Sequence, residues 1–157
     1  MCIRDRNIHN AIDTTRRIAH DLLPPTLEEF GLYEAIQELC DAYSSSGKLE
    51  VSMEADRTCV IEDKKKELNL FRILQELISN SIKHGQAKKI EMNCGLNNGR
   101  LEITYKDNGK GFDSTQKRKS KGLGMNSIDS RMKMIKGEWD YSSSVGNGME
   151  AKIYLSL

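Results

Sequence analysis

The chain has 157 residues, of which 24 are basic and 23 are acidic, so its formal net charge at pH 7 is only +1. This length predicts one compact domain with a short appendage, and the balanced charge excludes a global field that would attract nucleic acid or a membrane surface. No apolar run approaches the roughly 20 residues that cross a bilayer, and residues 1–6 lack the apolar core of a signal peptide. We therefore expect a cytoplasmic chain without membrane contact.

Cysteine usage agrees with that location. The chain has four widely scattered cysteines, Cys2, Cys40, Cys59 and Cys94. Their spacing forms neither a zinc-binding pair nor a disulfide framework, so we expect free thiols in a reducing compartment.

The first predicted helix covers residues 8–22. Its apolar positions are spaced by four and three, namely Ile8, Ile12, Thr15, Ala19 and Leu22. This spacing fits a short coiled-coil seam and, equally, an amphipathic helix that packs on its own domain. Pro24 and Pro25 should end the helix, because proline lacks the amide hydrogen and clashes with the preceding turn. Residues 1–6 fit this helix poorly and carry no functional weight.

A second helix should begin at Thr26, which stands three residues before Glu29 as in a capping box, and should end near Ser44. Alternating apolar residues then predict a strand over 48–53. The longest periodic segment, residues 63–84, predicts a helix with one buried stripe, made of Leu70, Phe71, Leu74, Leu77, Ile78 and Ile82.

The second half of the chain predicts mainly strands. Residues 89–96 and 100–107 flank Asn97-Asn98-Gly99, which is a strong hairpin signal. A polar, basic loop over 112–121 precedes a helix that starts near Met125 and ends near Gly137. Strands over 138–143 and 149–157 follow, joined by a turn at 146–148. Helices on one face of a mixed, mostly antiparallel sheet make an α+β two-layer sandwich.

Three polar patterns in this framework point to a binding site. The first places Glu76, Asn80 and His84 on one face of the long helix, with Lys83 beside them. Alone, such a stripe is more often a solvated face. An uncharged asparagine in mid-helix is a mediocre helix former, however, and its carbonyl is a good magnesium ligand. Lys83 or His84 could donate to phosphate oxygens.

The second pattern is Asp107, which ends a predicted strand and is followed by Gly109 and Gly111. The carboxylate could accept a hydrogen bond from an adenine amino group, while the glycines let the backbone approach a flat ring. Without the other patterns, an Asp-Asn-Gly sequence would be a common turn.

The third pattern is Gly122-Leu123-Gly124, which opens the helix near Met125. The free amide groups and dipole of a helix start suit anionic phosphates. Lys117, Arg118, Lys119 and Lys121 lie just before it, so we expect the loop over 112–121 to order over a triphosphate. A charge run of this kind is usually only a solvated loop.

Taken in this order, from residue 76 to residue 124, the patterns resemble the nucleotide site of the histidine-kinase and gyrase-type ATPase superfamily. Residues 76–84 look like its N box, and 107–111 and 122–124 like its two glycine boxes. Residues 16–32 are similar to the entry segment of two-component sensor histidine kinases. This resemblance implies a Bergerat-type ATP-binding fold over residues 26–157, preceded over residues 1–25 by the end of a dimerisation hairpin.

The resemblance also implies roles for individual residues. Glu76 and Asn80 would be catalytic, with Glu76 polarising the acceptor or a water and Asn80 binding Mg2+, and residues 112–121 would form the ATP lid. The ATP-binding set would be Asn80, Lys83, His84, Asp107, Gly109, Gly111, Lys121, Gly122, Leu123, Gly124 and Met125.

The implied reaction is transfer of the γ-phosphoryl group of ATP to a histidine on an upstream helix, for relay to a response regulator receiver domain. The intact protein would be a homodimer, without nucleic acid as a partner. His20 is followed by an acid, as a phosphoacceptor is, but its place before the two prolines favours a structural or surface role.

The chain departs from the family pattern at Gly146-Asn147-Gly148-Met149, where the family usually has Gly-Thr-Gly-Thr. The final threonine helps the adenine contact through water, and Met149 removes that contact. Two other readings therefore stay open. One is a serine-phosphorylating anti-sigma kinase or a gyrase-type or chaperone-type ATPase, and the other is a nucleotide-sensing module without turnover.

Overall fold

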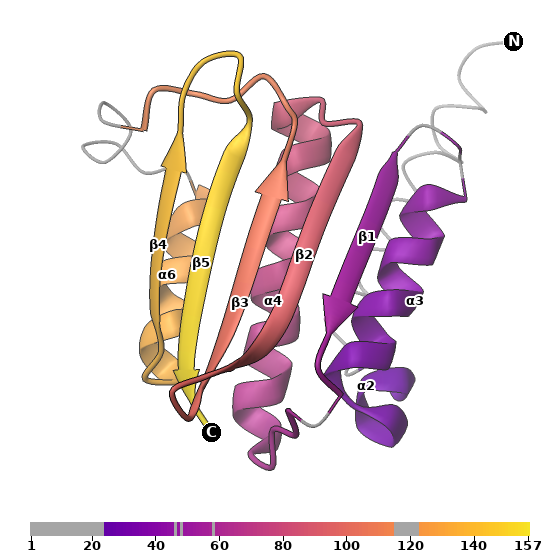
Figure 1. Ribbon diagram of the computed structural model, residues 1–157, viewed down its shortest axis with the longest axis vertical. Helices are drawn as coiled ribbons and strands as arrows, with labels where there is room; N and C mark the ends of the chain where they lie inside the picture. The colour runs from indigo at the N-terminus through magenta and orange to yellow at the C-terminus, as the bar shows by residue number, and fades with distance from the viewer. Residues whose placement is uncertain (1–23, 46, 48, 58, 115–122) are drawn as a thin grey trace, which may run out of the picture.

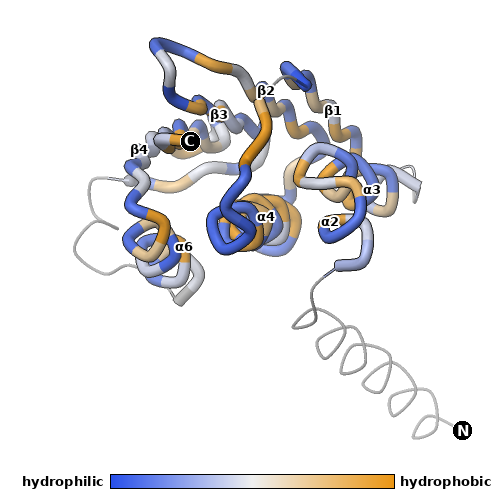
Figure 2. Tube along the Cα trace, turned by 90° about the horizontal axis from the view of Figure 1, so that it is seen from below, coloured by the Kyte–Doolittle hydropathy of each residue, from blue (hydrophilic) through white to orange (hydrophobic). Residues whose placement is uncertain are grey.

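The computed structural model describes residues 24–45, 47, 49–57, 59–114 and 123–157. These residues form two layers, a sheet and a set of helices that all lie on one of its faces (Figures 1 and 2). The predicted α+β two-layer sandwich is therefore confirmed. The predicted helix over residues 8–22 and the domain boundary after residue 25 depend on residues outside the described ranges.

The sheet has five strands in the order β1-β2-β3-β5-β4. The edge strand β1 (Glu50–Ala55) pairs in parallel with β2 (Lys89–Asn97), and the remaining pairs are antiparallel. Their strands are β3 (Arg100–Asp107), β5 (Met149–Ser156) and β4 (Glu138–Ser143). The central strand β3 thus has a hydrogen-bonded neighbour on each side, and it ends at Asp107. The first strand starts two residues later than the predicted 48–53.

The predicted second helix is divided into α2 (Pro25–Phe30) and α3 (Leu32–Ser44). Gly31 separates them with φ at 91°, a value that is unfavourable for other residues. The predicted capping box at Thr26 is wrong, because Pro24 is the N-cap and no side chain caps α2. Pro25 suits the first helical position, since its φ is already helical and its missing amide hydrogen has no partner there. The Thr26 hydroxyl instead donates to Glu38.

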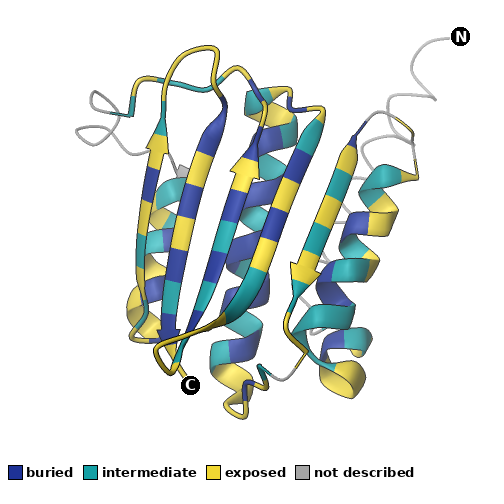
Figure 3. Cartoon of the chain, viewed as in Figure 1, coloured by how far each residue is buried: buried dark blue, intermediate teal, exposed yellow. Residues whose placement is uncertain are grey.

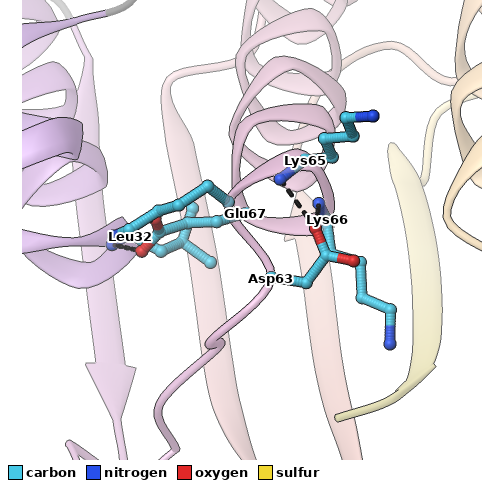
Figure 4. Close-up of polar contacts among 6 residues, drawn as sticks. Leu32, Asp63, Lys65, Lys66 and Glu67 are labelled. Atoms are coloured by element: carbon cyan, nitrogen blue, oxygen red, sulfur yellow. Dashed lines mark hydrogen bonds and ion pairs between the residues drawn. The ribbon is translucent and has the colours of Figure 1, made fainter.

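The entry to α4 (Lys64–Asn80) is held by two acids (Figure 4). Asp63 caps the helix, with its Oδ1 accepting from the backbone amides of Lys65 at 2.8 Å and Lys66 at 3.2 Å. Glu67 is 5% exposed, and its Oε1 accepts from the first amide of α3, that of Leu32, at 3.0 Å. Glu67 Oε2 lies 2.9 Å from Lys64 Nζ. A carboxylate of α4 therefore satisfies the start of α3 and joins the two helices.

The core lies between the helical layer and the inner face of the sheet, where strand residues alternate between buried and exposed (Figure 3). The predicted apolar stripe of α4 is buried here, although Ile82 is only partly so. The helix α6 (Leu123–Met134) packs beside α4.

The long helix does not continue regularly to His84. After Asn80 it becomes a π-helix, η1 (Ser81–Gly85), which ends at Gln86 in the left-handed conformation with φ at 53°. A π turn holds more residues than an α turn, so the predicted α-helical spacing of Glu76, Asn80 and His84 is wrong at its last member. Single π turns of this kind are frequent at functional sites.

Candidate functional site

A cavity of about 750 Å3 opens between the C-terminal end of α4, the end of β3 and the start of α6. This volume lies in the range of small-molecule sites. The lining residues are Glu76, Asn80, Ser81, Lys83, His84, Gly85, Asp107, Lys110, Gly111, Phe112, Gly124, Met125, Tyr141 and Met149.

Most of the predicted site residues are brought together in this cavity. Those that line it are Glu76, Asn80, Lys83, His84, Asp107, Gly111, Gly124 and Met125. Gly109 lies just behind and contacts Asp107, as described below, and Leu123 is the first residue of α6. Lys121, Gly122 and most of the predicted lid lie outside the described residues.

Asp107 is the buried acid of the site, with only 5% of its surface exposed. Its Oδ1 accepts from the backbone amide of Gly109 at 2.7 Å, and its Oδ2 accepts from the Ser81 hydroxyl at 2.6 Å. Each carboxylate oxygen has two lone pairs, so each keeps one for a ligand. The arrangement suits a ligand group that donates, such as an exocyclic amine.

Ser81 links this acid to the core of the sheet. Its hydroxyl oxygen lies 2.7 Å from Tyr105 Oη, and Tyr105 is 0% exposed. Burial raises the pKa of the Tyr105 phenol, and the nearby Asp107 acts in the same direction. The phenol is therefore a neutral hydroxyl beneath the cavity, in a chain of hydrogen bonds that runs from Tyr105 through Ser81 to Asp107.

The loop after β3 lies on η1 through close backbone contact. The amide of Lys110 donates to the carbonyl of Gly85 at 2.8 Å, and a Cβ on Gly109 would stand 2.7 Å from that carbonyl oxygen. Only a glycine fits at position 109 without displacing one of the two segments. The contact brings the first glycine box against the end of the N box.

The opposite end of the cavity is formed where α6 meets α4. A Cβ on Gly124 would stand 2.4 Å from Glu76 Oε1 and 3.0 Å from Asn80 Nδ2. The first turn of α6 is therefore in contact with these two side chains, which offer a carboxylate and an amide oxygen to the same cavity. Hard oxygen donors of this kind fit Mg2+, which also takes phosphate oxygens as ligands. Lys83 and His84 add exposed cationic or donor groups at the rim.

Sequence reasoning missed Ser81 as a site residue and did not connect Tyr105 with the site. A signal was present, because Ser81 follows Leu77 and Ile78 at helical spacing and so continues the apolar stripe. A hydroxyl on such a stripe needs a buried partner. The aromatic wall was also missed: Phe112 and Tyr141 have ring centroids 6.3 Å apart, and Trp139 stacks on Tyr141 at 5.0 Å.

Comparison with known families agrees with this geometry. A family described as "Histidine kinase-, DNA gyrase B-, and HSP90-like ATPase" matches residues 65–157, which include the cavity-lining residues. The chain belongs to this ATPase family. The resemblance to this superfamily is therefore confirmed, and membership in an ATPase family implies that the domain binds ATP.

Individual relatives point to one branch of the family. The chain is 33% identical over 142 residues to the sensor histidine kinase LiaS of Bacillus subtilis strain 168, covering 90% of this chain and 39% of LiaS. It is 28% identical over 154 residues to the sensor histidine kinase ComP of the same organism, covering 98% of this chain and 20% of ComP. The chain thus spans less than half of either relative.

Among solved structures, the histidine kinase AdeS of Acinetobacter baumannii superposes with a TM-score of 0.70 at 19% identity, covering 99% of this chain and 85% of that one. This likeness confirms the fold of a histidine-kinase ATPase domain. Within the described residues, every helix is too short or too polar to traverse a bilayer.

Proposed function

We propose that this chain is the ATP-binding and catalytic part of a two-component sensor histidine kinase. It binds ATP with Mg2+ and transfers the γ-phosphoryl group to a histidine on a helix of the intact protein. The observation that carries the proposal is the buried carboxylate of Asp107, whose protein partners are all donors. It shares one cavity with Asn80 and the start of α6.

The two ends of the cavity have different roles in this proposal. The adenine ring lies at the Asp107 end, beside Met149 and the Phe112–Tyr141 pair. Its amino group donates to the carboxylate, and the buried Met149 offers only apolar contact. Because no polar group stands at position 149, Asp107 carries most of the polar recognition of the base.

The phosphates lie at the other end, near the amides that open α6 and the donors Lys83 and His84. Asn80 holds Mg2+ through its side-chain oxygen, and the metal when bound neutralises charge on the phosphates. Glu76 lies close enough to Gly124 to share that space and polarises the attacking group. These assignments include the predicted catalytic pair Glu76 and Asn80.

The partners follow from the relatives named above. Sensor histidine kinases act in two-component signalling, so we propose that the phosphoryl group passes from that histidine to a response regulator receiver domain, and that the intact protein is a homodimer. A domain that consumes ATP in this way belongs in the cytoplasm. Residues 1–25 would be the end of the second helix of the dimerisation hairpin.

Nucleotide titration tests the binding part of the proposal. Asp107→Asn replaces the acceptor with a partly mismatched amide, and Asn80→Ala removes the metal ligand. Each substitution should weaken binding of a fluorescent ATP analogue about tenfold to a hundredfold. Asn80→Ala should also remove most of the increase in affinity that Mg2+ gives. Asn93→Ala is a matched control, because Asn93 is exposed on β2. Unchanged affinity in both site variants would refute the assignment.

Phosphoryl transfer tests the catalytic part. The isolated chain, mixed with radiolabelled ATP and a separately supplied helical hairpin that carries a phosphoacceptor histidine, should produce acid-labile, alkali-stable phosphate on the hairpin. Acid-stable phosphate would instead indicate a serine kinase of the same superfamily. Binding without any transfer would support a nucleotide-sensing module.

A further inference from the structure

We propose that Ser81 and Tyr105 are positioning residues that hold Asp107 as an obligate acceptor, and that they thereby set the preference of the site for a 6-amino purine over a 6-oxo purine. The inference rests on the proposed ATP site and assigns its base selectivity to the two residues that support Asp107. The observation behind it is the chain of short hydrogen bonds from Tyr105 through Ser81 to Asp107.

The direction of each proton in this chain follows from its end. The Ser81 hydroxyl donates its single proton to Asp107 Oδ2 at 2.6 Å. The Ser81 oxygen can then only accept from Tyr105 Oη at 2.7 Å, which makes Tyr105 the donor. The amide of Gly109 donates to Oδ1 from the other side. The carboxylate is therefore held by donors on both oxygens and is left to accept from a ligand.

Because the three side chains are buried, each hydrogen bond in this chain is difficult to replace. Tyr105 is 0% exposed, Ser81 4% and Asp107 5%, so bulk water has little access to replace a lost partner. A buried polar group without its hydrogen bond carries a full desolvation penalty. The three side chains therefore behave as one unit, and the orientation of the carboxylate depends on Ser81 and on Tyr105 behind it.

The chemical consequence concerns the base. Adenine presents an amino group that donates to a carboxylate, whereas guanine presents a carbonyl oxygen that would face the carboxylate as a second acceptor. By holding the carboxylate oxygens as acceptors toward the base, Ser81 and Tyr105 disfavour the 6-oxo purine.

Other titratable groups face the same cavity and also contribute to nucleotide affinity. They are Glu76 from α4, Lys83 and His84 from η1, and Lys110 from the loop after β3; Tyr141 of β4 also lines it. Because these groups are unchanged in variants at positions 81 and 105, their contribution cancels when each variant is compared with the wild type.

The experiment measures dissociation constants of fluorescent ATP and GTP analogues for wild type, Ser81→Ala, Tyr105→Phe and the double variant. Ser81→Ala should weaken ATP binding about tenfold and lower the ATP-to-GTP preference. Tyr105→Phe should act in the same direction with a smaller effect.

The double variant separates a chain of hydrogen bonds from independent effects. Since Tyr105 acts through Ser81, the double variant should bind no more weakly than Ser81→Ala alone. Ser81→Thr, which keeps the hydroxyl, should restore the ATP-to-GTP preference. Ser79→Ala, two residues earlier and outside the cavity lining, is the control and should resemble the wild type.

The outcomes distinguish this inference from the proposed function. A wild-type chain that binds neither nucleotide overturns the proposed function and the inference together. If the wild-type chain prefers ATP and both Ser81→Ala and Tyr105→Phe keep that preference, the inference alone is overturned, even if their affinity for both nucleotides falls. If Ser81→Ala does not fold, Tyr105→Phe, which removes only one oxygen atom, decides the question.

Discussion

The α-carbon of Gly148 lies directly against the backbone of Asp107. A Cβ built on Gly148 would stand 2.0 Å from the Asp107 carbonyl oxygen and 3.0 Å from its Oδ1. Gly148 also has φ at +68°, so both its conformation and its surroundings exclude a side chain. The turn between β4 and β5 thus supports the acid at the end of β3.

Gly148→Ala should therefore impair both folding and nucleotide binding, because the added methyl must push the turn away from Asp107. Gly146→Ala is a matched control: Gly146 also has a positive φ, of +86°, but nothing lies within 4 Å of its Cβ position. The control should lose only about 1 kcal/mol from backbone strain and keep its ATP affinity. Urea unfolding and ATP-analogue titration measure the two effects, and equal losses in both variants would contradict the close contact.

Glu67 should be a larger determinant of stability than its position at a helix start indicates. Glu67→Ala leaves the Leu32 amide and the start of α3 without their acceptor and should cost about 1.5–3 kcal/mol in the free energy of unfolding. Glu67→Gln keeps an acceptor and should cost less. Urea denaturation checks both, with the exposed Glu29→Ala as control. A loss in Glu67→Ala no greater than in the control would show that the bond is not needed.

The cap of α4 should give stability a dependence on acid pH. Hydrogen bonds from the amides of Lys66 and Lys65 lower the pKa of Asp63 in the folded chain. A lowered folded pKa means that this stabilisation is present above the unfolded pKa of about 3.9 and is lost as pH falls through the folded pKa. Asp63→Asn keeps an acceptor that does not titrate.

Thermal unfolding of wild type and Asp63→Asn should therefore show a stability difference that changes as pH falls from about 5 to 3 and levels off below the folded pKa. The wild type should lose stability relative to Asp63→Asn as the pH falls, since only the wild type has a cap that becomes protonated over this range. A difference that stays constant with pH would mean that the cap does not titrate in this way.

Thiol reactivity should differ among the described cysteines. Burial, with Cys59 and Asp56 as neighbours, raises the pKa of Cys94 to about 12, and burial likewise raises that of Cys40 to about 12, from an ordinary value of 9.0. At pH 8 the thiolate fraction of each cysteine is then about a thousandfold lower than that of a thiol with the ordinary pKa. Alkylation read by peptide mass spectrometry should label Cys59 before either one in the native protein and all three alike in denaturant. Native labelling of Cys94 as fast as Cys59 would contradict the burial of its thiol.

The parts of the fold that follow from local pattern were predictable. The hairpin around Asn98 and Gly99 has the positive φ angles that its sequence indicates, and β3 has the predicted bounds. The entry to α2 was not predictable from capping rules alone. Thr26 and Glu29 fit a capping box, but Pro24 and Pro25 occupy the positions that start the helix.

The candidate site also has residues that the sequence could predict and residues that it could not. Asn80 and Asp107, the proposed metal ligand and base acceptor, could be selected from residue type and place in the pattern, and the structure places both on one cavity. Ser81 and Tyr105 depend on how η1 crosses the end of β3, which is a tertiary contact between residues 24 positions apart. The π turn after Asn80 was also hidden, since its residues fit an α-helix equally well by composition.

The place of Asp107 at the end of the central strand has a consequence for product release. That strand is held on both sides, so the acid cannot withdraw without moving two neighbouring strands. In the proposed kinase, ADP carries the same base as ATP and receives the same contact after the γ-phosphoryl group has left. The spent nucleotide therefore competes with the fresh one, and occupancy by ATP follows the cellular ratio of ATP to ADP rather than the ATP concentration alone.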